Sequence, residues 1–400
     1  MFDNLLNQKA EQFLIQDIKT NSLPNSLLFS GPKNSGKFTC ALELARVLSC
    51  REQIKGQWLC TCPSCLKHKA LQSTDVIIAG NKDTALEIAG AKQSLLEASY
   101  NNASYLQAVR YLFIRSVRKL TNRFSPIIWE GEKDIAKISI ITQTIDELLE
   151  EMDPLRPILP MEKLEKNCEK LYEQCLKLES NFMYNSLPIA QIRNISSWAR
   201  YTIAEGKKLV ILENADKMLE NVRNAVLKIL EEPPKDCLFV LTTTRRSAII
   251  PTILSRVRTY NFVERTAEQK KDLVERIFHT DNPSVDDYLL SFLPVEPTVV
   301  QNVAINFWNN ITKGKIVNIN TLVNDCNNFK PRVLLRLFFN ILYQYQKKYL
   351  LNITDATKSA GMIEKMVNIS AKLRDTYDKI TIYNQSPESA LENLATELMR

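Results

Sequence analysis

The chain has 400 residues, which is enough for two or three domains that each bury their own core. Its hydrophobic content of 45% is that of a globular protein, and 52 basic side chains against 45 acidic ones allow contact with nucleic acid without requiring it. No apolar run is long enough to cross a bilayer and no leader pattern is present, so we expect a cytoplasmic protein with no membrane partner.

The first predicted elements are a strand, a glycine loop and a helix. Residues 27–30 are apolar, the pattern GxxxxGK follows, and residues 38–48 have helical spacing. This order places backbone N–H groups and a lysine around phosphate groups. We expect the nucleotide-binding residues of the loop to be Gly31, Ser35, Gly36, Lys37, Phe38 and Thr39.

One position of this loop departs from the pattern. Phe38 stands where such loops carry the hydroxyl that holds Mg²⁺, and the Thr39 hydroxyl lies about 100° further around the helix. The pattern alone leaves open whether the loop hydrolyses a nucleotide, only binds it, or does neither.

Four cysteines follow the helix: Cys50, Cys60, Cys62 and Cys65. Four thiolates close in sequence can hold a structural Zn²⁺ ion tetrahedrally, and disulfides are rare in cytosolic proteins. We therefore expect a structural zinc site, with His68 as a possible substitute ligand. The other five cysteines are expected to be small buried hydrophobic residues.

The middle of the chain changes character. A second short strand is predicted at 75–79, and residues 82 to about 187 show long helical patterns broken at 125–126 and 153–160. One helix carries an apolar stripe (Leu106, Val109, Phe113, Val117, Leu120) with basic residues around it (Arg110, Arg115, Arg118, Lys119, Arg123). It could contact DNA phosphates or another subunit, but we favour a helix that packs on its own domain.

Strands and helices alternate again after residue 187. The pattern predicts a helix at 192–204, a strand at 208–212, a helix at 220–232 stopped by two prolines, a strand at 237–241, and helices after 262. This alternation predicts a parallel sheet covered by helices on both faces, followed by a helical bundle.

The strand at 208–212 ends in a second candidate site. Glu213 occupies the position where ATPases with a phosphate-binding loop place a carboxylate that holds Mg²⁺ through water. Asn214 occupies the position of the acid that polarises the attacking water, and an amide cannot accept that proton. Phe38 and Asn214 together favour a chain that does not hydrolyse ATP.

Three stretches carry a family resemblance: NAVLKILEEPP at 224–234, CLFVLTTT at 237–244 and IIPTILSRV at 249–257. Together they resemble the core of bacterial DNA polymerase III clamp-loader subunits, the delta-prime and gamma/tau AAA+ proteins, over residues 2–79 and 190–262. The cysteine cluster belongs to the same pattern, with its second ligand shifted to Cys60 from the position held here by Leu59.

The resemblance implies roles for further residues. Thr242, Thr243 and Thr244 end a strand where the family has a nucleotide sensor, and we expect Thr243 to contact the nucleotide. Ser255 and Arg256 match a Ser-Arg pair whose arginine reaches a neighbouring subunit's ATP as an arginine finger. Alternatively, Arg256 caps a helix end or pairs with a surface acid. The family's next residue is usually cysteine, and here it is Val257.

The resemblance also implies an architecture: an α/β AAA+ P-loop domain at 1–263, with the cysteine cluster at 50–65 and a large helical insertion at about 82–187, then a helical lid at 264–312 and an all-α collar at 313–400. It implies a delta-prime-like subunit that supports ATP-dependent loading of the sliding clamp onto primed DNA. Its partners would be the gamma/tau and delta subunits, and it would have neither ATPase nor polymerase activity alone. The alternatives are an ATP-hydrolysing gamma/tau subunit, a stand-alone P-loop ATPase such as a helicase loader, and a scaffold with no role in a neighbour's site.

Overall fold

The computed structural model describes residues 1–184, 186–203, 206–351, 359–383 and 385–399. The chain divides into two compact units, Met1–Leu289 and Leu290–Arg400. Within the described ranges, no helix combines the length and the apolar character that crossing a membrane requires.

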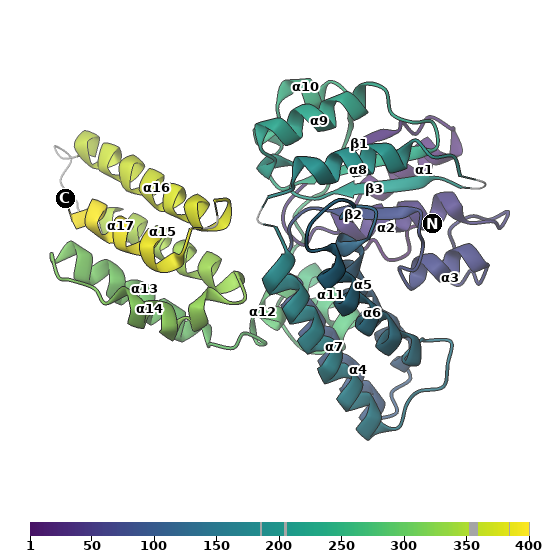
Figure 1. The fold of residues 1–400 in the computed structure, drawn as a ribbon, viewed down its shortest axis with the longest axis horizontal. Helices are drawn as coiled ribbons and strands as arrows, with labels where there is room; N and C mark the ends of the chain where they lie inside the picture. The colour runs from purple at the N-terminus through teal and green to yellow at the C-terminus, as the bar shows by residue number, and fades with distance from the viewer. Residues whose placement is uncertain (185, 204–205, 352–358, 384, 400) are drawn as a thin grey trace. The chain divides into compact units, whose positions relative to one another are not determined.

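The first unit is built on a five-stranded parallel sheet (Figure 1). Its strands are β1 (Ser26–Ser30), β2 (Val76–Ala79), β3 (Lys208–Leu212), β4 (Cys237–Thr243) and β5 (Arg258–Asn261). Their order is β2-β3-β4-β1-β5, and every neighbouring pair is parallel. The sequence predicted the first four strands and missed β5, a short edge strand in which only Tyr260 is buried.

Alternate residues of β1, β2, β3 and β4 face two different cores. Leu27 and Phe29 of β1 pack into a core with α1 (Ala10–Lys19) and α2 (Lys37–Ser49). Leu28 packs into a second core with α8 (Ile189–Ala199) and α9 (Glu220–Glu231). Because both faces of the sheet are covered, the strands read as continuous apolar runs. The predicted α/β class with helices on both faces is confirmed.

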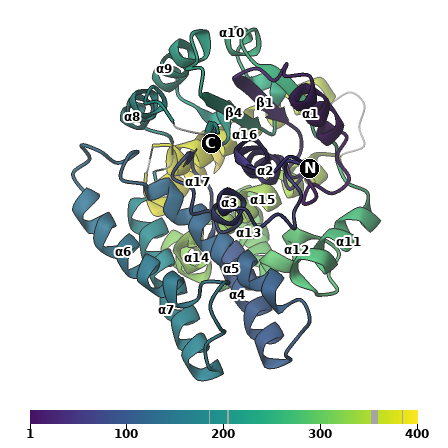
Figure 2. The same ribbon diagram turned by 90° about the vertical axis from the view of Figure 1, so that its right-hand side faces the viewer.

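The chain between β2 and β3 forms a bundle of long helices that Figures 1 and 2 show gathered together. Its members are α4 (Ala85–Tyr100), α5 (Leu106–Thr121), η1 (Asn122–Phe124), α6 (Ile135–Glu151) and α7 (Met161–Phe182). Both predicted breaks are present. The next helix, α8, begins three residues before the predicted start at 192 and ends at Ala199, and residue 204 lies outside the described residues. A crossover between parallel strands needs only one helix, so this bundle is additional to the sheet architecture.

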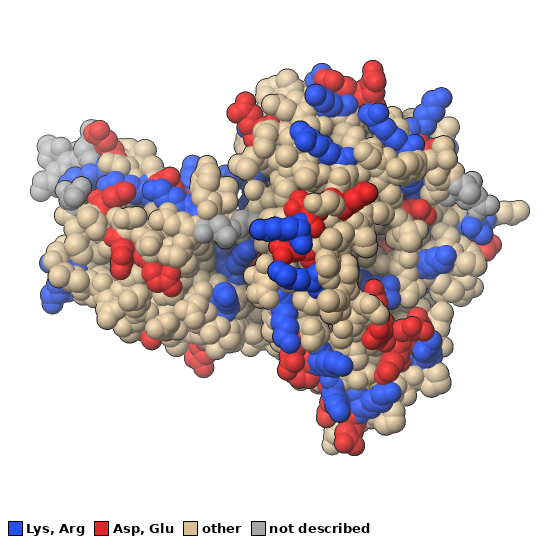
Figure 3. Space-filling view, viewed as in Figure 1, with Lys and Arg blue, Asp and Glu red and all other residues tan. Residues whose placement is uncertain are grey.

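Helix α5 buries its apolar stripe and directs several of its basic side chains to its own domain. Arg110 donates to the backbone oxygens of Asp153 and Arg156 at 2.7 and 2.8 Å. Arg115 donates to the backbone oxygen of Lys69 at 2.9 Å. Basic and acidic side chains are also mixed over the face shown in Figure 3. These contacts agree with the interpretation that the helix packs on its own domain.

The remaining α-helices of the first unit are α3 (Pro63–Lys69), α10 (Pro251–Leu254), α11 (Ala267–Phe278) and α12 (Val285–Leu290), the last of which ends one residue beyond the unit. Two short 3₁₀ turns, η2 (Ala215–Lys217) and η3 (Arg246–Ala248), also belong to it. The segment that holds α11 and α12 packs against the helical bundle. The Tyr288 hydroxyl donates to the backbone oxygen of Gly90 at 3.0 Å, and His279 stacks on Tyr105 with ring centroids 3.6 Å apart.

The described residues of the second unit form helices joined by short connections, with no strand among them. It contains α13 (Pro297–Thr312), α14 (Ile319–Asp325), η4 (Asn327–Phe329), α15 (Val333–Leu351), α16 (Ser359–Thr381) and α17 (Pro387–Met399). Its core includes Phe307, Phe338 and Leu394. Helix α13 packs with α15 and α17, although the predicted lid boundary at 312 would separate it from them. The predicted division at 263 and 312 stays a prediction.

Candidate functional site

The predicted site residues lie at the carboxyl edge of the parallel sheet. Strand β1 ends before Gly31, β3 ends before Glu213, and β4 ends at Thr243. Because all strands run in the same direction, these ends meet at one edge, where α/β proteins bind their ligands.

The phosphate loop joins β1 to α2. Gly36 has a left-handed backbone (φ 95°) immediately before Lys37, the first residue of α2. A Cβ atom on Gly31 would lie 2.4 Å from the backbone oxygen of Phe262, so only glycine allows this close approach. These two glycines thus define a tight loop that leads directly into the N-terminus of α2.

Lys37 is turned onto the loop itself. Its Nζ donates to the backbone oxygen of Gly31 at 2.6 Å and to Ser35 Oγ at 3.2 Å. Burial lowers the pKa of Lys37 to about 8, against the opposing effect of the Asp216 and Glu213 carboxylates.

The aromatic ring of Phe38 is surrounded by cations. Lys82 Nζ, Arg123 Cζ and Lys119 Nζ lie 5.3, 5.6 and 5.9 Å from its centroid. An aromatic face attracts cations at such distances. The position that offers a hydroxyl in an active phosphate loop therefore presents a ring that attracts basic side chains.

Glu213 is paired with a basic residue of the helical bundle. It accepts a hydrogen bond from Nη2 of Arg123, and the two side chains are 9% and 2% exposed. Arg123 also donates to the backbone oxygen of Gly80 at 3.3 Å. Magnesium requires an octahedral set of oxygen ligands, including carboxylate oxygens. With Glu213 bound to a guanidinium and no hydroxyl at position 38, the residues present do not fit a magnesium ion.

The Asn214 side chain forms a hydrogen bond to the backbone. It has a left-handed conformation (φ 54°), and its Nδ2 donates to the backbone oxygen of Asn81 at 2.9 Å. The side chain thus ties the end of β3 to the segment after β2.

Thr243 and Asp216 form a pair that the sequence prediction did not include. Asp216 is 2% exposed and accepts a hydrogen bond from Thr243 Oγ1 at 2.8 Å. Its other oxygen lies 3.5 Å from Arg245 Nε. The structure thus brings Thr243 to this edge as expected, with its hydroxyl donating to a carboxylate. The sequence could have pointed to Asp216, because it is an acid only three positions after Glu213.

Arg256 lies on the surface, two residues after α10. Its Nη2 donates to Glu231 Oε1 at 2.8 Å, and its Nη1 donates to the backbone oxygen of Thr252 at 2.8 Å. The side chain keeps a third of its surface exposed. The predicted alternative in which Arg256 pairs with a surface acid is therefore observed within the chain, while the guanidinium remains accessible from outside.

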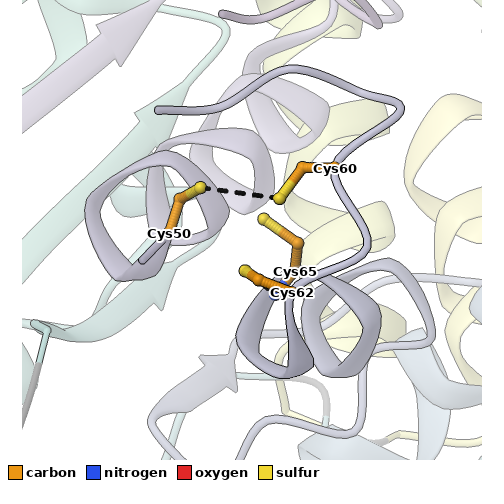
Figure 4. Close-up of side chains that lie close together, drawn as sticks. All are labelled: Cys50, Cys60, Cys62 and Cys65. Carbon is orange, nitrogen blue, oxygen red and sulfur yellow. Dashed lines mark hydrogen bonds between the residues drawn. The ribbon is translucent and has the colours of Figure 1, made fainter. Parts of the chain in front are cut away.

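The four cysteines form a compact cluster. Their sulfur atoms all lie within 4.8 Å of one another, and Cys50 Sγ and Cys60 Sγ are 3.8 Å apart (Figure 4). Two sulfurs bound tetrahedrally to one Zn²⁺ at about 2.3 Å lie roughly 3.8 Å apart. The one-residue shift of Cys60 therefore does not prevent four sulfurs from converging, and the donor set fits a structural zinc ion.

The local structure brings these sulfurs together and favours the thiolate form of Cys62. Cys50 follows the end of α2, Cys60 comes from a loop, and Cys62 caps α3, which contains Cys65. Burial opposes the thiolate, but backbone donors from Arg51 and Cys65 lower the pKa of Cys62 to about 7. Burial, with hydrogen bonds from the other thiols, raises the pKa of Cys65.

His68 lies outside this sulfur group. Burial, with the charges of Arg46 and Arg115 nearby, lowers its pKa to about 4. It is therefore a neutral buried side chain.

Arg46 of α2 links the cluster to the rest of the domain. Its side chain is 1% exposed, and Nε and Nη2 donate to Glu43 Oε2 at 3.0 and 2.8 Å. The guanidinium also donates to the backbone oxygens of Gly56 and Gln57, both at 2.9 Å, and to Cys65 Sγ at 3.7 Å.

Segments of this chain are similar in sequence to known proteins. It is 35% identical over 97 residues to the DNA polymerase III subunit delta' of Bacillus subtilis, a match that covers 24% of this chain and 29% of that protein. It is 36% identical over 80 residues to the delta' subunit of Pseudomonas aeruginosa, covering 20% of this chain and 24% of that one. It is 28% identical over 106 residues to the DNA polymerase III subunit tau of Bacillus subtilis, covering 26% and 19%. The matched segments thus span less than a third of each relative.

Two further comparisons cover more of the chain. A solved structure of a gamma-subunit-related protein of Thermotoga maritima aligns with 54% of this chain and 80% of its own, at 20% identity and a TM-score of 0.27. The family model for DNA polymerase III, delta subunit, matches residues 6–151 and 160–266, which is more than half of the 400 residues. These matched ranges contain the phosphate loop, the cysteine cluster, Arg123, Glu213 and Arg256. The chain therefore belongs to the DNA polymerase III delta subunit family.

Proposed function

We propose that this chain is a delta-prime-like subunit of a bacterial clamp loader, which donates Arg256 to a neighbouring subunit's ATP and does not hydrolyse ATP itself. The observation that carries the proposal is the pairing of Glu213 with Arg123 beside Phe38. In a hydrolysing subunit this carboxylate and a hydroxyl at position 38 would be free to serve the nucleotide and its metal.

The accessible position of Arg256 supports its proposed role at a neighbouring subunit's ATP. An arginine finger has to leave its own chain and meet developing negative charge on another subunit's γ-phosphate. Arg256 is a third exposed and held by a surface carboxylate, Glu231. Surface ion pairs contribute little stability, so the exchange from Glu231 to a phosphate has a low cost.

The proposed partners are the gamma/tau and delta subunits, the sliding clamp, and primed DNA through the complex, in the cytoplasm. A structural Zn²⁺ at the four cysteines belongs to the proposal, because their sulfurs lie within 4.8 Å of one another. When bound, the ion would cross-link the end of α2 to α3. Closed four-sulfur sites of this kind stabilise folds and leave no position for a substrate.

The test is ATP turnover by the purified chain, first alone and then mixed with the gamma/tau and delta subunits of the same genome, the clamp and primed DNA. We expect no turnover alone. The mixture should lose at least tenfold in rate with Arg256→Ala, since arginine fingers contribute about 10³–10⁵. Arg246→Ala, which removes another exposed arginine, is the matched control and should keep the rate.

The outcomes separate the alternatives. If the chain alone turns over ATP and the rate rises when the other subunits are added, the chain is a gamma/tau motor. If the rate of the chain alone does not change when they are added, it is a stand-alone ATPase. An unchanged rate with Arg256→Ala would leave a scaffold that takes no part in a neighbour's site.

A further inference from the structure

The helical bundle between β2 and β3 sends basic side chains to the carboxyl edge of the sheet. Lys82 precedes α4, Lys119 lies on α5, and Arg123 lies in η1. All three approach the ring of Phe38, and Arg123 continues to Glu213. Segments 90 residues apart in the sequence thus meet at the carboxylate that in a hydrolysing subunit would serve a metal.

We propose that Arg123 is a built-in cation that takes the place of a magnesium ion at Glu213 and closes this edge of the sheet to divalent metal. The guanidinium provides the positive charge that a buried carboxylate requires, and it does so from a fixed position within the fold. This gives the helical bundle a role in the site. The inference concerns the chain's own edge, so it stands or falls independently of any role of Arg256.

The other two cations near Phe38 are paired with a carboxylate of the same helical bundle. Glu87 of α4 accepts from Lys82 Nζ at 3.1 Å and from Lys119 Nζ. Burial works against its charged form, but Lys119 and Lys82 hold the pKa of Glu87 well below its usual range. The two lysines near Phe38 are thus held in place by Glu87, while Arg123 is held by Glu213.

An added divalent cation would meet unfavourable surroundings at this edge. It would have to displace Arg123 from Glu213 and would then lie near the ammonium groups of Lys82 and Lys119. It would also find the ring of Phe38 in place of an oxygen ligand, and magnesium binds oxygen ligands in a strict octahedral geometry. The same cations attract negative charge, so the exclusion applies to the metal and not to anions.

The experiment measures metal binding by the full chain with Mn²⁺ as the probe. Electron paramagnetic resonance compares free Mn²⁺ in a mixture of Mn²⁺ and ATP with and without the protein. Thermal unfolding is followed with and without added Mn²⁺ and without a chelator, so that a zinc ion at the four cysteines stays bound. For the wild type we expect the protein to cause no loss of the free Mn²⁺ signal beyond the loss that ATP causes alone, and the same unfolding midpoint with and without Mn²⁺. Metal-dependent ATP binding by the wild type would overturn the proposal, and this arm does not depend on whether any variant folds.

Three variants assign the effect to Arg123. Arg123→Gln leaves the Glu213 carboxylate without its cation, so we expect a lower midpoint without added metal and a rise when Mn²⁺ is added. The double variant Arg123→Gln/Glu213→Gln removes the unpaired charge, so its midpoint should recover in part and no longer respond to Mn²⁺. Lys82→Gln is the matched control, because it removes a cation from the same cluster without freeing Glu213, and it should not respond. An Arg123→Gln variant that folds and ignores Mn²⁺ would show that Arg123 is not what excludes the metal.

Discussion

Arg46 offers a sharp test of how the cysteine cluster is held to its domain. The substitution Arg46→Met keeps most of the side-chain volume and removes the guanidinium. Glu43, whose side chain is 1% exposed, then loses its ion-pair partner, although it still accepts a hydrogen bond from Asn4 Nδ2 at 3.4 Å. The backbone oxygens of Gly56 and Gln57 lose a donor at the same time.

The size of the effect follows from these contacts. Removing one partner of a buried ion pair costs about 3–5 kcal/mol, because the remaining charge stays desolvated. We therefore expect Arg46→Met to lower the free energy of unfolding of the first unit by about 3–5 kcal/mol. The double variant Glu43→Gln/Arg46→Met should regain much of this loss, because it leaves no orphaned charge.

The assay is urea unfolding of each variant, in which a loss of stability lowers the midpoint at an unchanged slope. Arg276→Met is the matched control: it breaks an ion pair to Asp272 whose side chains are 60% and 45% exposed. Such a pair contributes at most about 1 kcal/mol. If Arg46→Met costs no more than Arg276→Met, or if the double variant is as unstable as the single one, the reasoning from burial is wrong.

Cys60, His68 and Gly31 give three further predictions. Cys60→Ser should abolish zinc binding, measured by atomic absorption of the purified chain, whereas Cys326→Ser, in the second unit, should retain it; equal zinc in both would exclude Cys60 as a ligand. Because the folded pKa of His68 is about 4 and the unfolded value about 6.5, the unfolded chain gains a proton first as the pH falls. The wild type should therefore lose about 2 kcal/mol of stability between about pH 7.5 and 5 that His68→Gln does not lose, as measured by urea unfolding at each pH, and parallel pH curves would refute this. Gly31→Ala places a Cβ atom 2.4 Å from the backbone oxygen of Phe262 and should cost about 1–3 kcal/mol; an unchanged thermal midpoint would contradict that close approach.

The sequence allowed much of the sheet to be predicted, because buried parallel strands are short apolar runs with clear ends. The prediction for β3 matches Lys208–Leu212 at both ends, since Gly206 lies two residues before it and Glu213 follows it directly. β5 was missed because an edge strand with a single buried residue, Tyr260, carries no such run.

At the site, too, the sequence allowed local features to be predicted but not contacts between distant segments. Gly31, Lys37 and Glu213 could be placed together because parallel strands end at a common edge. Their partners could not be predicted, because the contact between Arg123 and Glu213 depends on how the helical bundle packs on the sheet. In the sequence, Arg123 was one of several basic residues on a helix with an apolar stripe, and nothing local set it apart.

The left-handed backbone at Asn214 has a consequence for how this chain could evolve. Asparagine adopts this conformation readily, whereas most other residues do so at a cost of about 1–2 kcal/mol. Replacing Asn214 with glutamate would carry that cost and would also remove the hydrogen bond to Asn81. The new acid would still face a carboxylate occupied by Arg123 and a loop that has phenylalanine at position 38. The substitution Asn214→Glu would thus lower stability before it could provide any chemistry, so by itself it gives selection nothing to favour.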